Sequence, residues 1–224
     1  MSSKELILAS ASDRRYQLLN QIGCAPDLVI PADVNEARLI GESPRELVTR
    51  LAFLKGEKIF RDHKEAVIVA ADTTVALGRR VVGKPRDAAE AEGFLTMLSG
   101  RNHRGYTSIY IRYGRSNRQR CIQTRVKFKK LTTLEISNYL DSAEWEGKAG
   151  GYAIQKKEIH LVENLEGCYT SSIGLPLCYL TETLTKIGVQ LPDIRHKYYM
   201  SLFNECTDCF FLNPTSDYKR GGLT

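Results

Sequence analysis

One aspartate follows the most apolar strand-like segment of the chain. Residues Val67–Ala71 are five consecutive apolar residues, which predicts a strand buried on both faces that ends at Asp72. In α/β sheets, ligands bind at the carboxyl ends of strands, so a carboxylate placed there can act on a bound substrate. An aspartate that only caps a turn is the alternative, and it is the commoner role for such a residue.

Two arginines lie in the first turn of a predicted helix. Residues 5–10 predict a buried strand, and a helix follows whose free N–H groups Ser12 or Asp13 can cap. Arg14 and Arg15 come next, where the helix dipole disfavours cations. A bound anion would reverse that cost, because helix N-termini bind phosphates. The pattern favours a phosphate site, with two solvated surface arginines as the alternative.

Two lysines stand in unusual surroundings. A helix is predicted from Ser43 to about Arg61, with a proline at its first position and a glutamate that closes a capping box. Lys55 falls on the apolar face of this helix, where it either extends to the helix edge, as lysines usually do, or points into a cleft. Lys84 lies between Gly83 and Pro85, in a turn of fixed shape that follows a short ribbon.

The order of predicted elements places the chain in the α/β class. Strands and helices alternate, and a hairpin of two longer strands comes near the middle. A loop at residues 146–155 has three glycines, which allow its backbone to approach a ligand closely. The later elements are a helix at 87–98, the hairpin at 106–113 and 120–129, a helix from Thr132, a strand at Ile159–Val162 and a helix at Leu177–Ile187.

The composition is ordinary for a soluble protein. The chain has 224 residues, 42% of them hydrophobic and 26% charged, enough for one large domain or two lobes. No apolar segment is long enough to span a membrane, and no signal region precedes the first strand. Its six cysteines are scattered and do not suggest a disulfide framework. We therefore expect a cytoplasmic protein.

The net charge of +6 suits an anionic partner. Residues 101–130 contain seven arginines, three lysines and no acid. Within them Arg125–Lys129 alternates charged and apolar residues, which predicts a half-buried strand with its charges in solvent. A nucleic-acid groove is the less favoured interpretation, because the stretch has no regularly spaced aromatic residues for stacking bases.

Four stretches together resemble the Maf family of nucleoside triphosphate pyrophosphatases. They are LILASASDRR at 6–15, AADTTVALGRRVVGKP at 70–85, LSGRNH at 98–103, and WEGKAGGYAIQ with EGCYTSSIGLPL between 145 and 177. The resemblance implies hydrolysis of a nucleoside triphosphate to the monophosphate and pyrophosphate, with Mg²⁺ or Mn²⁺. It also implies an elongated mixed β-sheet flanked by helices, two lobes with a central cleft, and a homodimer.

The resemblance also implies roles for individual residues. Asp72 corresponds to the family's proposed base, and Glu36 to a glutamate in a variable acidic loop; either carboxylate can serve as base, and both can hold the metal. Cations that neutralise the phosphates are expected at Arg14, Arg15, Lys55 and Lys84. The residues implied in substrate binding are Ser10, Arg14, Arg15 and Gln155, and those implied in catalysis are Glu36, Lys55, Asp72 and Lys84.

The LSGRNH and KAGGYAIQ segments resemble the branch of the family that acts on dTTP and UTP. Gln155 offers a donor and an acceptor, which suit a pyrimidine edge or its sugar. Asp13, Lys156 and the pair Ser171–Ser172 depart from the family's pattern. Because Asp13 and Lys156 bear on efficiency and substrate choice, a catalytically weak nucleotide-binding regulator of cell division is the alternative.

The resemblance divides the chain into a catalytic domain at residues 1–192 and a C-terminal extension at 193–224. In the extension, Cys206 and Cys209 supply two zinc ligands, and a tetrahedral site needs two more, of which His196 is one candidate. A loosely ordered or packing segment is the favoured interpretation of this extension.

Overall fold

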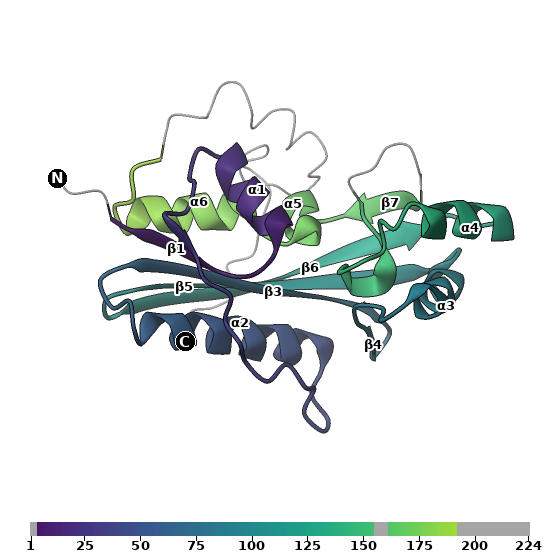
Figure 1. Ribbon diagram of the computed structural model, residues 1–224, viewed down its shortest axis with the longest axis horizontal. Helices are drawn as coiled ribbons and strands as arrows, with labels where there is room; N and C mark the ends of the chain where they lie inside the picture. The colour runs from purple at the N-terminus through teal and green to yellow at the C-terminus, as the bar shows by residue number, and fades with distance from the viewer. Residues whose placement is uncertain (1–3, 155–160, 192–224) are drawn as a thin grey trace.

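The computed structural model describes residues 4–154 and 161–191, and these form a seven-stranded mixed sheet flanked by helices (Figure 1). The strand order is β2-β1-β3-β5-β6-β7, with β4 paired to β3. β1 is parallel to β2 and β3, and all other pairs are antiparallel. The strands are β1 (Leu6–Ala9), β2 (Leu28–Val29), β3 (Val67–Leu77), β4 (Arg80–Val82), β5 (Asn102–Tyr113), β6 (Ser116–Phe128) and β7 (Val162–Glu166). The predicted α/β class is confirmed.

The helices divide between the two faces and one end of the sheet. The helices are α1 (Asp13–Gln21), α2 (Pro44–Phe60), α3 (Ala88–Leu98), α4 (Thr133–Asp141), the short 3₁₀ helix η1 (Ala149–Gly151), α5 (Tyr169–Ile173) and α6 (Leu177–Lys186). In Figure 1, α1, α5 and α6 cover one face and α2 covers the other, while α3 and α4 lie at the far end. The predicted capping box forms at the start of α2, and a second capping box forms at the start of α4.

The hydrophobic core consists of separate clusters on the two faces and at the far end of the sheet. One cluster packs α1 and α6 against β1 and β3, and a second packs α2 on the opposite face of the same strands. A third cluster lies at the other end, between β4, β6, α3 and α4. The long strands β3, β5 and β6 run through both ends (Figure 1). The expected elongated shape with two lobes follows from this arrangement.

The strand that carries Asp72 does not end there. β3 is continuous from Val67 to Leu77, and β5 pairs with it residue by residue on both sides of Asp72, which lies opposite Ser108. The prediction of a strand end was therefore wrong. Because β5 pairs with β3 without a break from Ile68 to Ala76, a polar side chain in mid-strand does not interrupt this ladder.

Two other expectations about strands have different outcomes. Half of the strand expected at Ile159–Val162 lies outside the described part of the chain, which omits residues 155–160, and the strand described next is Val162–Glu166. The alternating segment on β6 does expose its charges, and they pair with acids on neighbouring elements. These pairs are Arg125 with Glu166, Lys127 with Glu163, and Lys129 with Glu135.

In residues 4–154 and 161–191 we find no helix with the length and apolarity required to span a bilayer.

Two helical glycines give a matched test of how closely α2 packs on the sheet. A Cβ at Gly56 would lie 2.3 Å from Cδ1 of Tyr110, whereas a Cβ at Gly93 in α3 meets nothing within 4 Å. We expect Gly56→Ala to destabilise the protein by about 1–3 kcal/mol through overpacking. Gly93→Ala should stabilise it by about 0.5–1 kcal/mol, because alanine is the better helix former. Denaturant unfolding measures both, and equal effects would contradict this packing.

Candidate active site

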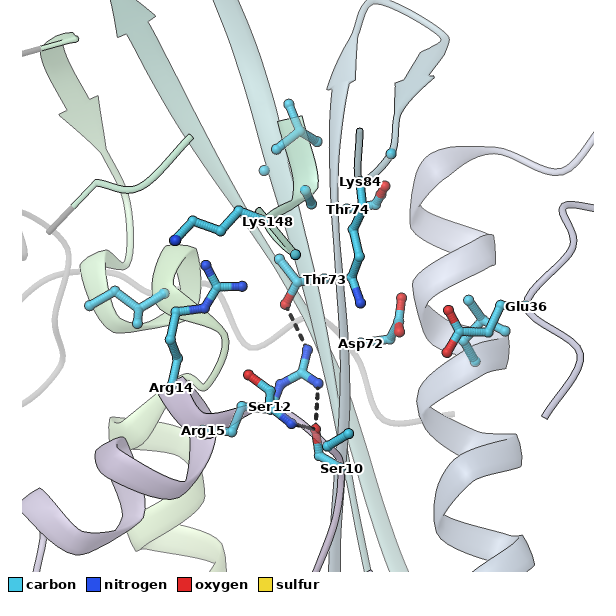
Figure 2. A pocket seen from close by; sticks show the side chains of 18 of the residues that line it. Ser10, Ser12, Arg14, Arg15, Glu36, Asp72, Thr73, Thr74, Lys84 and Lys148 are labelled. Atoms are coloured by element: carbon cyan, nitrogen blue, oxygen red, sulfur yellow. Dashed lines mark hydrogen bonds between the residues drawn. The ribbon is translucent and has the colours of Figure 1, made fainter. Parts of the chain in front are cut away.

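A cavity of about 790 Å³ lies at the junction of the two lobes (Figure 2). Its lining comes from the end of β1, the start of α1, the loop before α2, the middle of β3, the segment after β4, and η1. Elements distant in the sequence therefore meet at one place. The charged residues that line it are Asp13, Arg14, Arg15, Glu36, Arg38, Lys55, Asp72, Lys84, Glu146 and Lys148.

A lysine bridges two carboxylates in this cavity. Nζ of Lys55 lies 2.6 Å from Oδ1 of Asp72 and 2.6 Å from Oε1 of Glu36. The side chains of Lys55 and Asp72 are only 11% and 12% exposed, whereas that of Glu36 is 53% exposed. Lys55 lies on the buried face of α2 and points into the cavity, not to the helix edge.

The bridge keeps the glutamate ionised. Burial favours the neutral form of Glu36, but the hydrogen bond from Lys55 and the charges of Lys55, Lys84 and Arg15 outweigh it. The pKa of Glu36 therefore lies below its ordinary value, and this carboxylate is negative at neutral pH.

Arg15 is held in a fixed position beside the two carboxylates. Its Nη1 donates to Oγ of Ser10 at 2.9 Å, its Nη2 to Oγ1 of Thr73 at 3.2 Å, and its Nε to the carbonyl of Gly174 at 3.1 Å (Figure 2). Burial lowers the pKa of Arg15, and the negative charge of Asp72 opposes that shift. These contacts connect α1, β3 and the segment before α6, so the guanidinium is rigidly placed.

The start of α1 lacks the expected side-chain cap. The side chain of Ser12, the N-cap residue, makes no capping hydrogen bond, and its backbone N–H instead donates to Oγ of Ser10 at 3.2 Å. Ser12 and Asp13 both line the cavity. The prediction that they cap the helix was therefore wrong, and the positive end of the α1 dipole faces the cavity without a side-chain acceptor.

Lys84 lies between the two lobes. The carbonyl of the preceding residue, Gly83, accepts a hydrogen bond from the N–H of Gly150 in η1 at 2.8 Å, which fixes the start of this turn. Figure 2 shows the side chain of Lys84 directed toward Asp72. Its charge also contributes to the lowered pKa of Glu36.

Comparison with known proteins gives one consistent result. The family model described as Maf-like protein matches residues 5–187. The chain belongs to the Maf family.

Curated relatives of this Maf protein cover most of its length. The dTTP/UTP pyrophosphatase of Cereibacter sphaeroides is 46% identical over 186 residues, 83% of this chain and 96% of the relative. Proteins of the same name from Rhodopseudomonas palustris and Nitrobacter hamburgensis are 44% identical over 199 residues and 48% identical over 180 residues. These alignments cover 86% and 77% of this chain, and 95% and 87% of the two relatives.

The cavity brings together seven of the eight site residues expected from the sequence. They are Ser10, Arg14, Arg15, Glu36, Lys55, Asp72 and Lys84. Gln155 lies outside the described residues, as do Lys156, His196, Cys206 and Cys209. Sequence reasoning missed Thr73, Arg38 and Lys148. Thr73 is adjacent to Asp72 and Lys148 opens the KAGGYAIQ segment, so both lay within motifs already noted.

The acidic residues suit a metal ion that is shared with a substrate. The described residues contain no group of three or more histidine, cysteine, aspartate or glutamate side chains arranged to hold a metal. Mg²⁺ is commonly bound by one or two carboxylates together with substrate phosphates. Glu36 and Asp72, bridged by one lysine, match that smaller donor set.

The loop that carries Glu36 is fastened to α2 by a second ion pair. Arg50 donates to both carboxylate oxygens of Glu42, at 2.6 and 2.9 Å, and to the carbonyl of Ala37 at 2.9 Å. Glu42 also accepts the N–H of Leu39 at 3.0 Å. The hydrogen bond from Arg50 is the main reason that the pKa of Glu42 falls to about 2. This pair therefore supports the loop and, through it, Glu36.

We expect Glu42→Gln to destabilise the protein by about 1–3 kcal/mol at neutral pH, since it breaks a buried charge-assisted contact. The pKa of Glu42 is lowered in the folded state, so its contribution is complete above the ordinary value of 4.5 and is lost as the pH falls toward about 2. Thermal unfolding should show the difference between wild type and variant shrinking over this range.

The control for this prediction is Glu163→Gln, which removes a carboxylate from the exposed pair with Lys127. We expect this variant to stay within about 0.5 kcal/mol of wild type at neutral pH. A Glu42→Gln variant that keeps the same deficit at every pH would contradict the assignment.

Proposed function

We propose that this Maf protein hydrolyses nucleoside triphosphates, dTTP and UTP foremost, to the monophosphate and pyrophosphate. The observation that carries the proposal is the Lys55 bridge between Glu36 and Asp72 inside a cavity rich in cations. Relatives named dTTP/UTP pyrophosphatase, matched over nearly their whole length, support the substrate class.

The charge of the cavity supports an anionic substrate. Six arginines and lysines line it against four carboxylates, an excess of two positive charges. A triphosphate that carries one divalent cation keeps a net negative charge, which this excess complements. Arg15 is already oriented by three protein acceptors, so it can bind a phosphate oxygen with little further loss of freedom.

The two carboxylates share metal binding, and only one of them acts as the base in the proposed reaction. The lowered pKa of Glu36 makes it a poor proton acceptor, so we assign it to metal binding. Asp72 orients the water and accepts its proton as the new bond forms at the phosphorus nearest the nucleoside. The bond between that phosphorus and the bridging oxygen breaks, and its electron pair leaves with pyrophosphate. Lys55 and Lys84 neutralise charge that builds up on the phosphate oxygens.

The cofactor in this proposal is Mg²⁺ or Mn²⁺, held by Glu36 and Asp72 together with the substrate. When bound, the metal supplies positive charge that lowers repulsion between the phosphates and the attacking water. We further propose a cytoplasmic homodimer, a catalytic domain at residues 1–192, an extension at 193–224 outside the chemistry, and Gln155 as a contact to the base or sugar.

The test is release of pyrophosphate from a panel of nucleoside triphosphates with Mg²⁺ and Mn²⁺. We expect dTTP and UTP to be the best substrates and Asp72→Asn to reduce turnover at least about 100-fold, the smallest loss typical of a general base. Asp87→Asn is the matched control, because this aspartate caps α3 outside the cavity and asparagine caps equally well. It should leave turnover unchanged.

Two outcomes would overturn the proposal. Release of inorganic phosphate instead of pyrophosphate would mean that a different bond is cleaved. Tight, metal-dependent nucleotide binding without turnover would favour the regulator, and Asp13, a negative charge at the start of α1 in the cavity lining, is the feature that would then explain it.

A further inference from the structure

We propose that Lys148 is a further substrate-binding residue, which binds the phosphate chain from the side of the cavity that Arg14 occupies, and that Glu144 positions its ammonium group. This inference rests on the proposed function, since it takes the substrate to be a nucleotide with several phosphates. Figure 2 shows Lys148 and Arg14 on one side of the cavity, and Asp72 and Glu36 on the other.

The backbone of Lys148 is fixed, so its side chain projects from a defined point. Its N–H donates to the carbonyl of Trp145 at 3.3 Å, and its carbonyl accepts the N–H of Gly151 at 3.0 Å. It is the N-cap residue of η1, which Gly83 ties to the segment that carries Lys84. The side chain is only 17% exposed, yet it lines the cavity.

One carboxylate acts on both cations on this side of the cavity. Glu144 contacts Nζ of Lys148 at 3.3 Å, a longer contact than the 2.6 Å contacts of Lys55. Its charge also raises the pKa of Arg14, against the larger lowering that burial causes. Within residues 4–154 and 161–191 the Arg14 guanidinium donates no hydrogen bond, so its donors are available to a ligand.

The contacts of these two cations leave room for an added anion. Glu144 interacts with both Arg14 and Lys148, while Asp13 and Glu146 also line the cavity. Removing a cation from water is costly unless a partner compensates it. A phosphate oxygen between the two side chains would supply that compensation, and Lys148 has three donors with which to meet both Glu144 and the phosphate.

The chain contains a matched pair that lacks these properties. Glu182 and Lys186 have the same four-residue spacing on α6 and lie 2.5 Å apart, but their side chains are 46% and 70% exposed, and neither lines the cavity. An exposed pair of this kind contributes little and is screened by salt. Substitutions of Glu182 and Lys186 therefore serve as controls for the loss of a glutamate or a lysine from a pair with the same spacing.

The experiment measures calorimetric affinity for dTTP and for pyrophosphate, together with pyrophosphate release, in the full chain. Lys148→Met should weaken binding of both ligands roughly 10- to 100-fold and lower kcat/KM by the same factor, as expected for a lost charge-assisted hydrogen bond. Lys148→Arg should restore most of the affinity. Glu144→Gln should weaken binding less, and the double variant should be no worse than Lys148→Met.

The control variants Lys186→Met and Glu182→Gln should bind and turn over like wild type. Unchanged affinity of Lys148→Met for both ligands would overturn the proposal. So would weaker binding of dTTP with unchanged binding of pyrophosphate, because the lysine would then contact the nucleoside and not the phosphates. If Lys148→Met lowers the melting temperature but the folded variant binds both ligands with wild-type affinity, Lys148 has a structural role only.

The same measurements separate this proposal from the proposed function. If wild type releases pyrophosphate and Lys148→Met matches it, the assignment of Lys148 fails and the function stands. If wild type binds dTTP without turnover and Lys148→Met binds it more weakly, the function fails and the assignment of Lys148 stands. A wild type that neither binds nor hydrolyses nucleotides overturns both.

Discussion

The site depends on one buried cation between two acids. Lys55 lies 2.6 Å from Asp72 and 2.6 Å from Glu36, and the three side chains come from a helix, a strand and a loop. Two carboxylates in a partly buried cavity repel each other unless a cation lies between them, and the penalty grows as water is excluded. The bridge therefore helps to keep Glu36 ionised and holds the two acids close together, where a metal and a phosphate can bind.

Much of the fold serves to bring these three elements together. The capping box fixes the start of α2, its apolar face packs on β3 and β5, and Gly56 lets the helix approach Tyr110 closely. The pair Arg50–Glu42 then fastens the loop that presents Glu36. On the opposite face Arg15 joins α1 to β3 through Thr73. Each element that lines the cavity is therefore held in place by its own packing, hydrogen bonds or ion pair.

The second lobe contributes two lysines to the cavity. Lys84 and Lys148 come from segments beside α3 and η1, at the end of the sheet away from α1 and α6 (Figure 1). The hydrogen bond from Gly150 to Gly83 links these two segments. A ligand that spans the cavity contacts both lobes, and β3 passes through the centre as the common support.

The sequence predicted the helices best, because their signals are local. Ser43, Thr132 and the periodic apolar residues determine where α2 and α4 begin and which faces are buried. It failed for the end of β3, which pairing with the distant strand β5 decides, and for the start of α1, where Ser12 makes no capping hydrogen bond. Likewise, whether Lys55 extends to solvent or into a cavity depends on acids 17 and 19 positions away.

The family motifs located seven residues of the site, because each motif corresponds to an element that lines the cavity. The same motifs did not single out Lys148 or Arg38. A lysine beside glycines has many ordinary roles, and only the folded chain shows that this one shares a carboxylate with Arg14 on one side of the cavity.

The most direct test of the central claim is turnover of dTTP in water enriched in ¹⁸O, with the label located by mass spectrometry. If Asp72 directs water to the phosphorus nearest the nucleoside, one ¹⁸O enters the nucleoside monophosphate and none enters pyrophosphate. Label in pyrophosphate or in inorganic phosphate would contradict the account, because water would then attack a phosphorus farther from the nucleoside.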